Sequence, residues 1–178
     1  MDGATLQYAH SFIGRHPFFD GVAVFFASYV PYIFVAAFVI LLFTRGAFGD
    51  VSPLARKHRR LQFVLTVLFS LCLASGIIVP FIHYIYARPR PFAEFGWPPL
   101  FAFTPSPSFP SGHATFMFLL AASMWQLRAQ WGYWLFAVAT LTACARVYSL
   151  VHYPTDVIAG ALVGIGTAFA VRRIVRGL

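Results

Sequence analysis

The chain has 178 residues, of which 60% are hydrophobic and only 10% are charged. Ordinary soluble domains carry about 25% charged residues, so this composition excludes a water-soluble protein and indicates a single membrane-embedded domain over residues 1–178. The net charge of +8 does not indicate a nucleic-acid partner, because the basic residues lie in short segments between apolar stretches, as membrane topology requires.

The N-terminal half of the chain predicts one short helix and two membrane-spanning helices. Residues 3–14 mix polar and apolar side chains and are too short to cross a bilayer, so we expect an interfacial helix there. Residues 22–43 carry no charge, which predicts the first span, and Pro31 is expected to kink it. Residues 61–84 predict the second span, with His83 near its end.

The segment from residue 86 to residue 112 differs in composition from the spans around it. Its proline density forbids a continuous helix, so we expect a long loop. Its aromatic side chains indicate a loop that packs at the membrane surface. The prolines are Pro89, Pro91, Pro98, Pro99, Pro105, Pro107 and Pro110, and the aromatic residues are Phe92, Phe95, Trp97, Phe101, Phe103 and Phe109.

Three further apolar stretches complete the expected bundle, at residues 114–127, 133–146 and 154–171. In the last stretch Gly160 and Gly164 form a GxxxG pair, which favours close packing inside the bundle over a dimer face and leaves the oligomeric state open. We therefore expect an all-α polytopic membrane helix bundle with about five transmembrane helices plus an N-terminal interfacial helix.

The basic residues predict how this bundle is oriented. With five spans, nine of the 13 basic residues fall on one side of the membrane. The positive-inside rule makes that side cytoplasmic, which places the C-terminus in the cytoplasm and the proline-rich loop on the outer face. In a bacterium with two membranes this is the periplasmic face of the inner membrane. The nine residues are Arg45, Arg56, Lys57, Arg59, Arg60, Arg128, Arg172, Arg173 and Arg176.

Polar residues form three short clusters on the expected outer face. Taken singly, they are typical of a membrane anchor, a helix cap and a structural hydrogen bond. Taken together, they bring guanidinium groups, a helix N-terminus and two histidines to one side of the membrane, which favours a functional site. The clusters are Arg88-Pro89-Arg90-Pro91, then Pro110-Ser111-Gly112-His113, and finally Arg146 with His152 and Asp156.

Phosphoryl transfer is the chemistry that suits this set. The guanidinium groups of Arg90 and Arg146 are suited to bind pairs of phosphate oxygens. The backbone amides of Ser111 and Gly112 lie at the start of the third span, where free N–H groups and the helix dipole favour an anion. Because glycine has no side chain, Gly112 also lets the backbone approach an oxyanion closely.

The remaining polar residues supply a nucleophile and a proton carrier. His152 is the candidate nucleophile, which would form a phosphohistidine. Asp156, one helical turn later, is placed to accept the other ring N–H of that histidine. His113 is the candidate general acid for the leaving oxygen and the later base for water. Outward-facing carboxylates are too few for a magnesium site, and no histidine cluster has zinc spacing, so neither a metal nor a cofactor is expected.

The three clusters resemble the motifs of the type 2 phosphatidic acid phosphatase superfamily, whose fold is shared with vanadium haloperoxidases. That pattern reads Lys-x6-Arg-Pro, Pro-Ser-Gly-His and Ser-Arg-x5-His-x3-Asp. The first motif ends here at Arg90-Pro91, the second matches in full at residues 110–113, and the third matches at Arg146, His152 and Asp156. The resemblance covers residues 83–156 and implies a membrane-embedded lipid phosphate phosphatase.

Two positions depart from the superfamily pattern. The lysine is replaced by His83, and the serine before the second arginine by Ala145. Losing the lysine removes a permanent cation from the phosphate site. Either His83, when protonated, or Arg88 would have to replace it, and the sequence leaves both open as phosphate ligands.

Within the superfamily, the run from Tyr86 to Phe92 and the short chain resemble bacterial undecaprenyl pyrophosphate phosphatases linked to bacitracin resistance. This resemblance implies removal of the terminal phosphate from a polyprenyl diphosphate at the outer leaflet, a step of peptidoglycan precursor recycling. Phosphatidylglycerol phosphate, phosphatidic acid and a lipid A phosphate stay open as alternative substrates. A transporter with an arginine-lined anion site is a remote alternative, because no internal repeat is evident.

Overall fold

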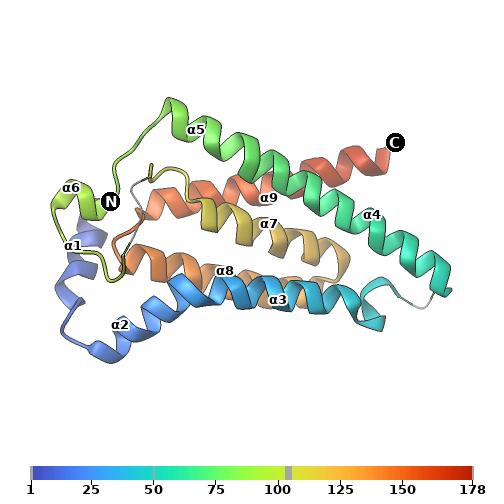
Figure 1. The fold of residues 1–178 in the computed structure, drawn as a ribbon, viewed down its shortest axis with the longest axis horizontal. Coiled ribbons are helices and arrows are strands. Elements are labelled where there is room, and N and C mark those ends of the chain that lie inside the picture. The colour runs from blue at the N-terminus through green and yellow to red at the C-terminus, as the bar shows by residue number, and fades with distance from the viewer. Residues whose placement is uncertain (1, 50, 103–105, 178) are drawn as a thin grey trace.

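The computed structural model describes residues 2–49, 51–102 and 106–177. Phe103 and Pro105 of the proline-rich loop lie outside these residues, as do the side chains of Arg45 and Arg176. Within the described part of the chain every regular element is helical, which confirms the predicted all-α class. Five long helical runs alternate in direction along the long axis of the molecule (Figure 1).

The elements follow one another in a simple order along the chain. The short ones are α1 (Asp2–Phe12), η2 (Arg45–Phe48) and α6 (Pro91–Phe95). The five long runs are α2 (Pro17–Val24) with η1 (Phe25–Tyr29) and α3 (Val30–Phe43); α4 (Pro53–Leu71) with η3 (Cys72–Ile78) and α5 (Val79–Ile85); α7 (Gly112–Leu127); α8 (Ala129–Tyr148); and α9 (Pro154–Gly177).

Three of the long runs are long and apolar enough to cross a membrane. They cover Pro17–Phe43, Pro53–Ile85 and Pro154–Val175, with lengths of 27, 33 and 22 residues. Helix α7 has only 16 residues, or about 24 Å at 1.5 Å per residue, which is less than the hydrocarbon thickness of a bilayer. Most of its side chains are buried, because it runs through the interior of the bundle between α8 and α9.

Proline shapes the first two runs. Each contains a π-helical segment that ends shortly before a proline, η1 before Pro31 and η3 before Pro80. A proline has no N–H, and its ring presses on the carbonyl four residues earlier, so the helix widens locally instead of ending. The expected perturbation by Pro31 thus takes the form of a π-turn within a continuous run.

Two glycines set the distance between α9 and α7. A Cβ atom at Gly160 would lie 2.5 Å from the carbonyl oxygen of Ser111, and one at Gly164 would lie 2.2 Å from that of Thr115. Neither approach is possible for a larger residue without moving a helix. The GxxxG pair is therefore used for packing inside the chain, and it draws the start of α9 against the start of α7.

The end of the bundle where α7 begins is covered by α1 and α6 (Figure 1). Leu6 of α1 is fully buried and packs against Leu150 and Tyr153 in the connection between α8 and α9. Helix α1 is thus tied to the bundle through this contact. Helix α6 lies inside the segment expected to be a loop, where Pro91 occupies its first turn and costs no hydrogen bond.

Candidate active site

All three sequence clusters meet at the end of the bundle covered by α1. Arg90 immediately precedes α6, and Ser111 immediately precedes α7. Arg146 lies in the last turn of α8, and Asp156 in the first turn of α9. The α8–α9 connection between them carries His152, which lies 3.1 Å from Arg90 through its Nε2 atom. The topology therefore joins residues more than 60 positions apart into one cluster.

His152 is 2% exposed, and both of its ring nitrogens have neighbours. Nδ1 lies 3.0 Å from the carbonyl oxygen of Ser108 and 3.6 Å from Oδ2 of Asp156. A carbonyl only accepts hydrogen bonds, so Nδ1 carries the proton and Nε2 keeps its lone pair toward Arg90. The expected acceptor was Asp156, but the closer one is Ser108, a residue that the motifs did not indicate.

The charge state of His152 follows from its surroundings. Burial lowers the pKa of its imidazole from 6.5 to about 4; the carboxylate of Asp156 opposes this change, and the cation of Arg90 adds to it. At neutral pH the ring is therefore neutral. A neutral imidazole with its proton fixed on Nδ1 presents Nε2 as the nucleophilic atom.

Asp156 is fully buried, and its carboxylate is surrounded by donors. Oδ2 accepts hydrogen bonds from the Ser108 hydroxyl and from the backbone N–H of Tyr153, the latter at 2.8 Å. Oδ1 accepts from Arg88 Nη1 at 3.0 Å. These bonds compensate the burial of a carboxylate. Asp156 therefore fixes the Ser108 segment, whose carbonyl orients His152.

Arg90 is 5% exposed and clamps two segments of the site together. Its guanidinium donates to the carbonyl oxygen of Val151 at 2.6 Å, and to the carbonyl oxygen and hydroxyl of Ser106, each at 2.9 Å. Burial lowers the pKa of Arg90 to about 10, so the group remains a cation at neutral pH. The same side chain thus positions the loop and puts a positive charge beside Nε2 of His152.

Arg146 is held by the first long helical run. Its side chain is 2% exposed, and Nη1 donates to the carbonyl oxygen of Ala27 in η1 at 3.0 Å. Ala27 lies four residues before Pro31, which has no N–H to offer this carbonyl. The proline in the first run therefore leaves the Ala27 carbonyl accessible to the guanidinium of a predicted phosphate ligand.

The start of α7 offers fewer free amides than the sequence suggested. Ser111 caps the helix, because its hydroxyl accepts from the backbone N–H of Ala114 at 3.4 Å. Its own N–H donates to the backbone carbonyl of Asp156 at 3.0 Å and so is not available to an anion. The first-turn amides of Gly112 and His113 are then the ones that can meet a phosphate. The side chain of His113 is exposed.

The two candidates for the missing cation contact protein groups instead of an open space. Arg88 donates to Asp2 at 3.1 Å and to Asp156 at 3.0 Å, and its guanidinium lies 3.6 Å from the ring centroid of Tyr153. This places it on the far side of the Asp156 carboxylate from His152. His83 Nε2 lies 3.0 Å from the carbonyl oxygen of Pro110, beside the start of α7.

Several residues of the site escaped sequence reasoning. Ser106 and Ser108 lie between prolines in the long loop, and this alternation was the only local signal. Asp2 reaches Arg88 from the other end of the chain and also accepts from the Thr155 hydroxyl at 2.6 Å. Ala27 contributes only a backbone carbonyl. Contacts of this kind depend on the tertiary fold, and no local residue pattern predicts them.

The sequence matches the PAP2 superfamily over residues 63–178. The undecaprenyl-diphosphatase BcrC of Bacillus subtilis (strain 168) is 26% identical over 170 residues, which cover 95% of this chain and 81% of that protein. A lipid A 1-phosphatase of Rhizobium etli is 32% identical over 137 residues, which cover 70% of this chain and 58% of that protein.

A solved structure shares the fold. The crystal structure of LpxE of Aquifex aeolicus superimposes with a TM-score of 0.72 at 23% identity, covering 97% of this chain and 94% of that one. The family match extends over more than half of the chain and includes all three site clusters. The chain therefore belongs to the PAP2 superfamily and is a membrane-embedded phosphatase.

Proposed function

We propose that the protein removes the terminal phosphate of a polyprenyl diphosphate, with undecaprenyl diphosphate as the preferred substrate, at the outer leaflet of the bacterial plasma membrane. The observation that carries this proposal is the state of His152, whose Nδ1 donates to Ser108 while Nε2 lies beside Arg90. A neutral, oriented imidazole next to a fixed cation is the arrangement that attack on a phosphorus atom requires.

The reaction then has two steps. The terminal phosphate takes over the Arg90 N–H that Nε2 of His152 accepts in the free protein. Nε2 then attacks the terminal phosphorus, the bond from phosphorus to the bridging oxygen breaks, and protonated His113 gives its proton to the leaving lipid monophosphate. His113, now a base, takes a proton from water, which attacks the phosphohistidine and releases inorganic phosphate. Arg90, Arg146 and the amides at the start of α7 stabilise the phosphoryl oxygens in both steps.

A lipid substrate is supported by an apolar groove beside the site. It has a volume of about 810 Å³ and runs along α1, α8 and α9, with Phe12, Val147 and Val157 among its lining residues. Val157 follows Asp156 directly in the chain. An isoprenoid tail laid in this groove would keep its diphosphate close to the α8–α9 connection.

A lipid A phosphate is the second candidate substrate, because a lipid A 1-phosphatase is among the relatives. Purified protein should therefore be given undecaprenyl diphosphate, phosphatidylglycerol phosphate, phosphatidic acid and a lipid A phosphate in parallel, with EDTA in every reaction. We expect the highest kcat/KM for undecaprenyl diphosphate, and no loss on chelation. A clear preference for another head group would refute the substrate assignment, and loss of activity with EDTA would refute the metal-free mechanism.

The orientation in the membrane is part of the proposal. Single cysteines placed at Glu94 in α6 and at Lys57 in α4 mark opposite ends of the bundle. In intact cells the first should react with a membrane-impermeant maleimide and the second should not. The reverse labelling pattern would place the active site in the cytoplasm.

A further inference from the structure

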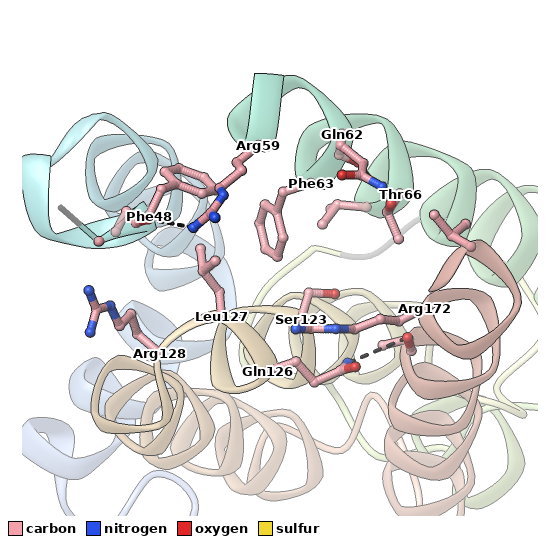
Figure 2. Close-up of a pocket in the computed structure, with 15 residues that line it drawn as sticks. Phe48, Arg59, Gln62, Phe63, Thr66, Ser123, Gln126, Leu127, Arg128 and Arg172 are labelled. Carbon is pink, nitrogen blue, oxygen red and sulfur yellow. Dashed lines mark hydrogen bonds between the residues drawn. The ribbon is translucent and has the colours of Figure 1, made fainter. Parts of the chain in front are cut away.

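A second cavity lies at the far end of the bundle from the catalytic cluster, and Figure 2 shows the residues that line it. Helix α7 connects the two places, because its first turn belongs to the active site and its last turn lines this cavity. The volume is about 400 Å³, and the walls come from η2, α4, α7 and α9. No part of the proposed reaction uses this cavity.

Three arginines are among the lining residues, and Figure 2 shows the guanidinium of Arg128 turned away from the hollow. Arg59 comes from α4, Arg128 follows the end of α7, and Arg172 comes from the last turns of α9. Figure 2 shows Arg59 and Arg172 on opposite walls of the hollow. Arg59 Nη1 donates to the carbonyl oxygen of Phe48 at 3.5 Å, which holds its guanidinium at the wall. Cations on opposite walls favour an anion in the space between them.

Polar groups that suit a phosphate lie between these cations. Ser123, 6% exposed, and Thr66 bring hydroxyl groups to the wall. Gln126 is held in place because its Nε2 donates to the Ala168 carbonyl at 3.4 Å, drawn as the dashed line near Arg172 in Figure 2. Phe63 adds an apolar wall. Among the lining residues that the structure describes, none is acidic.

Membrane topology alone does not explain this arrangement. A positive-inside signal needs only basic residues near the membrane surface. Lys57 and Arg173 serve that purpose, since they are exposed, lie on the same two helices and do not line the cavity. The convergence of arginines from three elements on one polar hollow is a separate feature, and basic pockets between transmembrane helices are sites for anionic head groups.

We propose that this cavity binds the phosphate of an anionic phospholipid head group in the leaflet opposite the active site. The guanidinium groups would bind the phosphate oxygens, and the hydroxyl of Ser123 would donate a further hydrogen bond. The hydroxyl of Thr66 donates to the Gln62 carbonyl at 2.8 Å and forms part of the wall. A lipid is favoured over free phosphate because the cavity lies among helix ends, at the depth of lipid head groups, and has an apolar wall for the first carbons of the lipid. The inference does not depend on the substrate or the mechanism proposed above.

The test is a thermal unfolding series on the full chain in nanodiscs. The discs contain phosphatidylcholine alone, phosphatidylcholine with added phosphatidylglycerol, or phosphatidylcholine alone with inorganic phosphate in the buffer. We expect phosphatidylglycerol to raise the Tm of the wild-type protein by about 5 °C. The double variant Arg59→Gln/Arg172→Gln should lose this shift, whereas the charge-matched control Lys57→Gln/Arg173→Gln should keep it.

Each outcome decides the question. Equal loss in both double variants would show a general surface-charge effect and overturn the site, as would retention of the shift in both. An equal shift with inorganic phosphate, lost in the same arginine variant, would make the ligand free phosphate and overturn the lipid assignment. Anion binding at the active site is common to both double variants and cancels in their comparison. If the double variant does not fold in phosphatidylcholine, the single variant Arg172→Gln replaces it, with Arg173→Gln as its control.

Discussion

Replacing Pro31 by alanine tests how the first long helical run positions Arg146. The variant gives residue 31 an N–H that can bond the carbonyl of Ala27, the group to which Arg146 Nη1 donates at 3.0 Å. The guanidinium then competes with the helix backbone for its anchor. Arg146 is 2% exposed, so no bulk water is at hand to replace the lost contact.

The size of the effect follows from the kind of bond. A hydrogen bond from a charged donor contributes about 1.5–3 kcal/mol, and about 1.4 kcal/mol corresponds to a tenfold change in an equilibrium or rate. We therefore expect kcat/KM to fall about 10- to 100-fold in Pro31→Ala, with a parallel rise in the inhibition constant of vanadate. The helix itself should become more stable, since alanine is a better helix former than proline.

Pro80→Ala is the matched control, because Pro80 also follows a π-helical segment, η3. Gly76, four positions before it, lies in η3, which contributes no residue to the active site described above. Steady-state kinetics on a soluble short-chain prenyl diphosphate, with Tm values for both variants, separate the two cases. Equal losses in both variants, or full activity in Pro31→Ala, would refute the positioning role.

The remaining predictions concern packing, proton balance and the loop. In Gly160→Ala the new Cβ would lie 2.5 Å from the backbone oxygen of Ser111, so this variant should destabilise the protein by about 1–3 kcal/mol. In Gly166→Ala the new Cβ would meet no atom within 4 Å, so the Tm should stay unchanged. Because His152 must be neutral to attack, kcat/KM should stay constant as the pH falls through 6.5 and should decrease only near pH 4. A decrease in kcat/KM centred at pH 6.5 would contradict this. Ser108→Ala removes a donor to Asp156 but keeps the carbonyl that orients the imidazole, so kcat should fall about tenfold, and a loss as large as that of a nucleophile variant would be inconsistent.

The sequence predicted the class of fold and the clusters of the site because both depend on local patterns. Long uncharged runs define membrane helices, and the spacing of His152 and Asp156 places them one helical turn apart. Local patterns predict secondary structure less accurately where prolines lie within a segment. The proline density of residues 86–112 predicts a loop throughout, but a proline in a first turn is compatible with a helix, and Pro91 occupies the first turn of α6.

The partners of the site residues were harder to foresee. Spacing alone predicts Asp156 as the acceptor for the His152 ring N–H, whereas the folded loop brings the Ser108 carbonyl to a shorter distance. Ser111 was expected to offer its amide to an anion, but the close contact of α9 with α7 gives that amide to the Asp156 carbonyl. Both differences arise from contacts between segments far apart in the chain, which no local pattern contains.

The phosphohistidine intermediate is the central claim, and rapid chemical quench with a terminally ³²P-labelled prenyl diphosphate tests it most directly. The wild-type protein should acquire a label that is stable in base and labile in acid, as a phosphoramidate is. The label should accumulate in His113→Ala, where water is not activated, and should be absent from His152→Ala. An acid-stable label, or a label that persists in His152→Ala, would contradict the account.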